Sequence, residues 1–84
     1  MTDRTQVASR VREVVAQVLD LPPAEIEPEL SAATSSAWTS LNHLMLISQL
    51  ENEFGIVFSN QEIKDLTSYS AIVEALSRRL DSVA

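Results

Sequence analysis

The chain has 84 residues, room for one domain, and its 45% hydrophobic and 21% charged residues are typical of a globular protein. It contains no cysteine, one histidine and one glycine, which excludes disulfides, cysteine or paired-histidine metal sites and glycine-rich nucleotide-binding loops. A net charge of −6 opposes nucleic-acid binding, and without a signal pattern or a long apolar run we expect a cytoplasmic protein with no membrane span.

The charge is distributed unevenly along the chain. Eight of the twelve acidic residues, but only one of the six basic ones, lie between Asp20 and Asp65. This segment favours partners with basic surfaces. An acidic surface that only keeps a small domain in solution is, however, the commoner explanation of such a charge.

The first periodic segment predicts a helix that begins after Asp3 or Thr5 as its cap and ends near Asp20, before Pro22-Pro23. Its apolar residues recur at helical spacing: Val7, Val11, Val14, Val15, Val18 and Leu19. Residues 21–38 then show no sustained period and have only Ile26 and Leu30 as apolar anchors. We expect a long loop, and loops of this length are usually functional or disordered.

A second helix is predicted from a cap at Thr39 or Ser40 through Phe54, with Gly55 in the left-handed position that follows the helix. One arc of about 160° is predicted to face the core. This arc contains Leu44, Leu46, Ile47, Leu50 and Phe54. Leu41 and Met45 fall outside it, which indicates contact with another molecule.

Two more helices follow. Ser59 and Glu62 form a capping-box pattern before a short helix over residues 60–66, with Ile63 and Leu66 inward. Thr67 or Ser68 then caps a last helix, whose apolar residues are Tyr69, Ile72, Val73, Leu76 and Leu80. We therefore predict a single all-α domain over residues 1–84, a small four-helix bundle with a long first loop and a short third helix. Nothing in the sequence requires more than a monomer.

Catalysis and metal binding by the chain alone are not expected. His43 lies one helical turn after Ser40, but no readable oxyanion hole accompanies a Ser–His pair, so a half-exposed helix residue is favoured. The carboxylates of Glu25, Glu27 and Glu29 lack the glycine-turned spacing of a calcium loop and are interpreted as a solvated acidic stretch.

Ser40 is the candidate for modification. It lies where the long loop meets the positive end of a helix, so a phosphate on its hydroxyl would be stabilised by unpaired backbone N–H groups and the helix dipole. Periodicity alone favours the simpler role of a serine that caps the helix.

The residues around Ser40 resemble those of the acyl carrier protein family. The resemblance is carried by residues 38–41, Trp-Thr-Ser-Leu, by the leucine-rich helix after them and by Glu53-Phe54-Gly55-Ile56 at its end, and it extends over nearly all of residues 5–80. It implies that a phosphopantetheinyl transferase attaches 4′-phosphopantetheine from coenzyme A to Ser40. The arm would hold acyl groups as thioesters, and the carrier itself would not be an enzyme.

The resemblance also implies partners, namely acyl-loading and acyl-transferring enzymes with basic or apolar docking patches. We expect them to contact Leu41, Met45, Glu51 and Glu53. Thr39 stands where the family usually has aspartate, and the helix is poor in acids, which favours a specialised carrier that docks mainly through apolar contacts. Trp38 either packs over the loop, the favoured interpretation, or flanks the arm.

Two alternatives remain open from the sequence. An aminoacyl or peptidyl carrier would share the serine but would be loaded by an adenylating ligase. An unmodified helical adaptor would bind its partner through Leu41 and Met45 and would not need Ser40.

Overall fold

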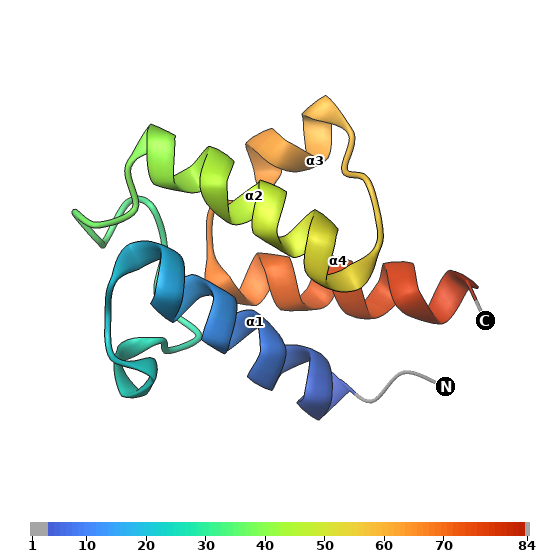
Figure 1. Ribbon diagram of the computed structural model, residues 1–84, viewed down its shortest axis with the longest axis horizontal. Coiled ribbons are helices and arrows are strands. Elements are labelled where there is room, and N and C mark those ends of the chain that lie inside the picture. The colour runs from blue at the N-terminus through green and yellow to red at the C-terminus, as the bar shows by residue number, and fades with distance from the viewer. Residues whose placement is uncertain (1–3, 84) are drawn as a thin grey trace.

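The computed structural model describes residues 4–83, in which four α-helices and one 3₁₀ turn are joined by loops (Figure 1). In chain order these are α1 (Arg4–Leu19), the turn η1 (Pro23–Glu25), α2 (Ser40–Phe54), α3 (Asn60–Asp65) and α4 (Tyr69–Val83). The described residues contain no β-strand, only an isolated antiparallel bridge between Ser31 and Ser68. The predicted fold class is confirmed. No helix in residues 4–83 is both long and apolar enough to cross a membrane.

The two ends of α1 differ from expectation in detail. The helix begins at Arg4, so Thr5 lies inside its first turn and is not the cap, while Asp3 lies outside the described residues. At the other end Asp20 adopts a left-handed conformation with φ 56°, and the Leu21 N–H donates to the Ala16 carbonyl at 2.9 Å. This reversal ends the helix before the two prolines are reached.

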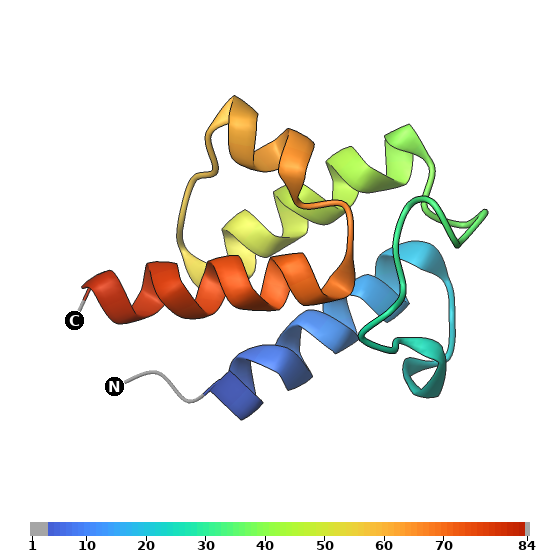
Figure 2. The same ribbon diagram turned by 180° about the vertical axis from the view of Figure 1, so that it is seen from behind.

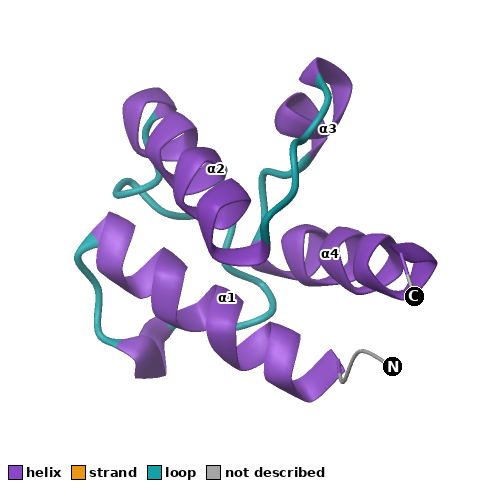
Figure 3. Cartoon of the chain, turned by 45° about the vertical axis from the view of Figure 1, so that its right-hand side comes forward, coloured by secondary structure: helices purple, strands orange, loops and turns teal. Residues whose placement is uncertain are grey.

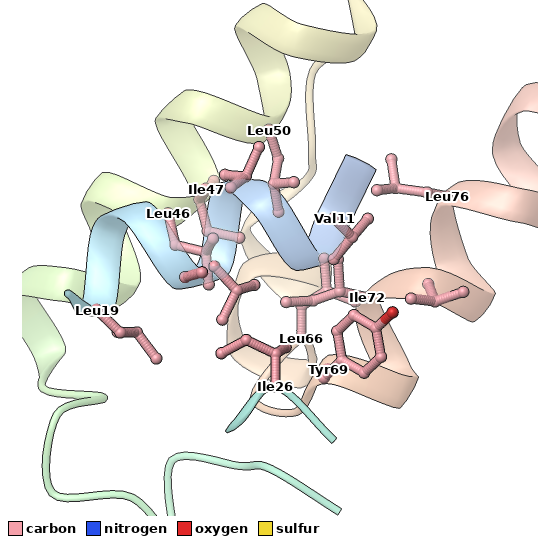
Figure 4. Packing of buried hydrophobic residues seen from close by; sticks show 14 of the residues in the cluster. Val11, Leu19, Ile26, Leu46, Ile47, Leu50, Leu66, Tyr69, Ile72 and Leu76 are labelled. Atoms are coloured by element: carbon pink, nitrogen blue, oxygen red, sulfur yellow. The ribbon is translucent and has the colours of Figure 1, made fainter. Parts of the chain in front are cut away.

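The core forms where α1 packs against α2 and α4 (Figures 2 and 4). The apolar stripe of α1 is buried there except for Val18, which is partly buried. The other helices contribute Leu46, Ile47, Leu50, Tyr69, Ile72, Val73 and Leu76, and the segments between helices contribute Ile26, Trp38, Phe58 and Leu66. Burial of this surface is the main force that holds α1, α2 and α4 together.

The predicted faces of α2 are partly correct. Leu46, Ile47 and Leu50 are buried and Phe54 is partly buried, but Leu44 is 59% exposed, so its assignment to the core is wrong. The reason is tertiary: α3 packs less closely on α2 than α1 does (Figure 3), and Leu44 is left exposed while Leu46 and Ile47 are buried. Gly55 has φ 64°, the left-handed conformation predicted for it.

The short helix α3 begins with the predicted capping box between Ser59 and Glu62. Leu66 after it is buried, and Ile63 is only partly buried. Arg79 of α4 holds this end of α3: its guanidinium donates to the Glu62 carboxylate at 2.8 and 2.9 Å and also contacts the Val57 carbonyl. The Ser59 backbone N–H, followed by Arg79, lowers the pKa of Glu62.

The loop between α1 and α2 is pinned to the start of α4. Ala32 donates its N–H to the Thr67 carbonyl at 2.9 Å, and Tyr69 donates its N–H to the Leu30 carbonyl at 3.0 Å. Ile26 anchors the middle of the loop in the core. Ser68 caps α4, since its hydroxyl accepts the Ala71 N–H at 3.1 Å. The loop is thus ordered by tertiary hydrogen bonds, and it leads directly to Ser40.

Truncation of a buried and of an exposed side chain on α2 should affect stability differently. Leu50 is fully buried, and Leu50→Ala should lower the free energy of unfolding by about 2–5 kcal/mol because it leaves a cavity. Met45 is 47% exposed, and Met45→Ala should change that free energy by less than about 0.5 kcal/mol. Urea denaturation followed by circular dichroism measures both, and comparable losses would show that Met45 packs in the core.

Glu62 should make stability depend on pH in the acidic range. Because its pKa is lower in the folded chain, its contribution is fully present above its unfolded pKa and is lost as pH falls through the folded value. The difference in unfolding free energy between wild type and Glu62→Gln should therefore be largest near neutrality and shrink below about pH 4.5. Denaturation at a series of pH values measures this difference. The control Glu29→Gln alters an exposed loop carboxylate, and a pH-independent difference for Glu62→Gln would contradict the assignment.

Candidate functional site

Ser40 is the first residue of α2, and Thr39 is its N-cap. The Thr39 hydroxyl accepts the Asn42 N–H at 3.1 Å, so Thr39 takes the capping role. The alternative in which Ser40 caps the helix is wrong. Ser40 is exposed, and its hydroxyl makes no hydrogen bond to any residue that the structure describes. The hydroxyl is therefore free to react.

The surroundings of Ser40 favour an anion. The first amides of a helix have no acceptor within the helix, and here only the Asn42 amide is satisfied by the cap side chain. The first turn of α2 contains no acidic residue that would compete for these groups. A phosphodiester on the Ser40 hydroxyl would lie at the positive end of the helix dipole, so the residues present fit a phosphate-linked group.

A pocket of about 300 Å³ opens beside Ser40. Its walls come from the long loop, the first two turns of α2 and the link between α3 and α4. The lining residues are Ala32, Trp38, Thr39, Ser40, His43, Leu44 and Thr67. Leu44, which the sequence placed in the core, faces this space. Trp38 is 4% exposed and belongs to the core, as packing over the loop predicts, and it is also one of the residues that line the pocket.

His43 has a structural role that sequence reasoning missed. Its Nδ1 accepts a hydrogen bond from the Trp38 indole N–H at 3.1 Å, and its Nε2 lies 2.7 Å from the Ile63 carbonyl oxygen. Both ring nitrogens are therefore occupied, and the imidazole makes no hydrogen bond to Ser40. The considered Ser–His pair does not form. The only hint in the sequence was an indole five residues before the imidazole, across the start of a helix.

The residues expected to contact partners fall into two groups: two exposed apolar residues, and two acidic residues that already have partners within the chain. Leu41 is 68% and Met45 is 47% exposed. The two acids already have contacts within the chain: Glu51 accepts the Phe58 N–H at 2.9 Å, and Glu53 pairs with Arg10. Leu44 and Val57 are further exposed apolar residues that the sequence did not single out.

The acidic residues of the loop do not form a metal site. Glu25, Glu27 and Glu29 are exposed. Within residues 4–83, no three histidine, aspartate or glutamate side chains lie close enough together to hold a metal ion.

Comparison with known proteins points to a carrier. The profile of the family described as "Phosphopantetheine attachment site" matches residues 9–76. An acyl carrier protein of Thermosynechococcus vestitus is 26% identical over 78 residues, which cover 93% of this chain and 96% of that protein. An acyl carrier protein of Rubrobacter xylanophilus is 28% identical over 72 residues, or 86% of this chain and 89% of its own.

The family match covers most of the chain, including the loop, the exposed serine and the helix that follows it. The prosthetic group is 4′-phosphopantetheine, attached covalently, and the chain is a carrier rather than an enzyme. On these grounds the chain belongs to the acyl carrier protein family of phosphopantetheine-binding domains.

Proposed function

We propose that Ser40 is the attachment residue and that residues 1–84 act as one acyl carrier domain in the cytoplasm. The observation that carries this proposal is the exposed, unbonded hydroxyl of Ser40 at the positive end of α2. A phosphopantetheinyl transferase joins the Ser40 oxygen to the phosphorus that carries pantetheine. The pyrophosphate bond of coenzyme A breaks, adenosine 3′,5′-bisphosphate leaves, and the hydroxyl proton passes to a base of the transferase.

The arm supplies a thiol, which holds an acyl group as a thioester and which this cysteine-free chain lacks. The residues of the chain orient the arm. The free amides at the start of α2 stabilise the phosphate, and Thr39 keeps the helix from beginning later. Thr39 offers no carboxylate to the transferase, so recognition at this position depends on a hydroxyl that is already engaged in the cap.

Partner enzymes dock, in this proposal, on the exposed part of α2 next to Ser40. Leu41 and Met45 provide apolar contact, and the helix carries no Asp, Glu, Lys or Arg from Ser40 to Leu50. Glu51 and Glu53 add negative charge at the far end, where a basic partner group would have to share Glu53 with Arg10. Apolar burial thus supplies most of the affinity, and the two carboxylates help to set orientation.

The cargo is proposed to be an acyl group of fatty acid, lipid or polyketide-type biosynthesis. The pocket beside Ser40 supports this because its walls include Trp38 and Leu44, which would cover an apolar chain. An aminoacyl or peptidyl carrier is the alternative. Incubation of the modified protein with fatty acyl donors and, separately, with an adenylating ligase and amino acids distinguishes the two.

Intact mass measures the attachment directly. Incubation of the unmodified chain with coenzyme A and a broad-range phosphopantetheinyl transferase should add the mass of one phosphopantetheinyl group. Ser40→Ala should add none, because it removes the only proposed acceptor oxygen. The control Ser36→Ala alters another exposed serine, four residues earlier in the loop, and should be modified like wild type. An equal mass gain in Ser40→Ala would refute the assignment.

The docking surface can be tested with the modified protein and an acyltransferase that accepts it. Met45→Glu should raise the KM for the carrier by about tenfold, because it places a charge in an apolar contact. The control Ser9→Glu adds the same charge to an exposed position of α1 and should leave KM unchanged. An unmodified adaptor predicts a different pair of results: Ser40→Ala would keep full function while Met45→Glu abolished it.

A further inference from the structure

We propose that His43 is a positioning residue: it clamps α3 to the start of α2 and thereby sets the width of the pocket in which cargo on the Ser40 arm lies. The pocket part of this inference rests on the proposed function of Ser40. The clamp itself rests only on the contacts of His43. The two parts can therefore be tested separately.

Helix α3 depends on contacts at its ends. It has only six residues, none of them fully buried, and helices this short are not stable in isolation. It also packs less closely on the other helices than α1 does. At its first turn it is held by the capping box and by Arg79. At its other end it is held by His43, through the Ile63 carbonyl.

The partners of His43 determine which of its ring nitrogens donates and which accepts a hydrogen bond. The Trp38 indole nitrogen can only donate, so His43 Nδ1 accepts and carries no proton. The proton of the neutral ring is then on Nε2, which donates to the Ile63 carbonyl. This carbonyl belongs to the last turn of α3, where backbone oxygens have no partner within the helix. His43 thus caps α3 from a different helix.

This chain of hydrogen bonds borders the pocket. Trp38 and His43 both line it, and so does Thr67, which lies just after α3. Release of the Ile63 carbonyl would free the end of α3 and move that wall away from Leu44. Leu44 is 59% exposed and apolar, so it gains from an apolar occupant that covers it. With the clamp closed the pocket has about 300 Å³, and loss of the clamp removes the wall that would hold an acyl chain against Leu44.

Three variants separate the hydrogen bonds from the shape of the ring. His43→Leu removes both bonds. His43→Gln keeps one acceptor and one donor and should restore the clamp. Trp38→Phe removes the indole donor, leaves the Ile63 contact of His43 in place and shortens a buried ring. Asn52→Leu, at an exposed position of α2, is the matched control for a polar-to-leucine change on this helix.

The clamp is measured by amide hydrogen exchange of the full chain without the arm. In His43→Leu the amides of residues 63–66 should exchange about fivefold faster, as expected for the loss of one hydrogen bond. Amides in the middle of α1 and α4 should be unchanged, and His43→Gln should return the α3 rates toward wild type. Equal α3 rates in His43→Leu and wild type overturn the clamp. Should His43→Leu fail to fold, His43→Phe takes its place with the same two outcomes, because it keeps a planar ring and has neither ring nitrogen.

The pocket is measured with acyl forms of the modified protein. Trp38 is the only tryptophan, so its fluorescence reports what enters the pocket. In wild type the emission should shift progressively as the acyl group lengthens from acetyl to octanoyl, and the octanoyl thioester should resist hydroxylamine more than the acetyl one. In His43→Leu this length dependence should be lost, with recovery in His43→Gln. The same length dependence in wild type and His43→Leu overturns the pocket part. Failure of Ser40 to accept the arm is seen separately, as an unchanged mass.

Discussion

One hydrogen bond, from the Asn42 amide to the Thr39 hydroxyl, determines where α2 begins. Because Thr39 caps the helix, Ser40 becomes its first residue and keeps a free hydroxyl beside unpaired amides. A start one residue later would make Ser40 the cap and occupy its oxygen. The chain also passes at this point from the buried Trp38 to the exposed Ser40. Thr39 therefore fixes this helix end without adding a negative charge.

The helices are held in place by two different kinds of interaction. Helices α1, α2 and α4 share an apolar core, which stabilises them through many contacts of similar value. Helix α3 is held mainly by hydrogen bonds and an ion pair at its ends, from His43 and Arg79. Loss of one of these contacts should therefore lower the local stability of α3 more than loss of one contact lowers the stability of the packed core. We thus expect local opening at α3 to cost less free energy than opening of the shared core.

The acidic residues of the chain are absent from the part of α2 that follows Ser40: no Asp or Glu occurs from Ser40 to Leu50. Glu51 and Glu53 stabilise the end of α2 through Phe58 and Arg10, while the loop acids, Glu25, Glu27 and Glu29, are exposed to solvent. The surface beside Ser40 is apolar, with Leu41, Leu44 and Met45 on the same helix. Under the proposed function, charge guides a partner from a distance, while the close contact beside Ser40 is apolar.

The sequence by itself determined the four helices, the capping box at Ser59, the left-handed Gly55 and the place of Ser40 at a helix start. These features depend on contacts within about four residues along the chain, which periodicity and cap chemistry reveal. Only the tertiary structure decided that Leu44 is exposed, that Glu53 pairs with Arg10 and that His43 caps α3. These outcomes depend on how far each helix lies from its neighbours, and a helical pattern describes the face of one helix without stating what covers it.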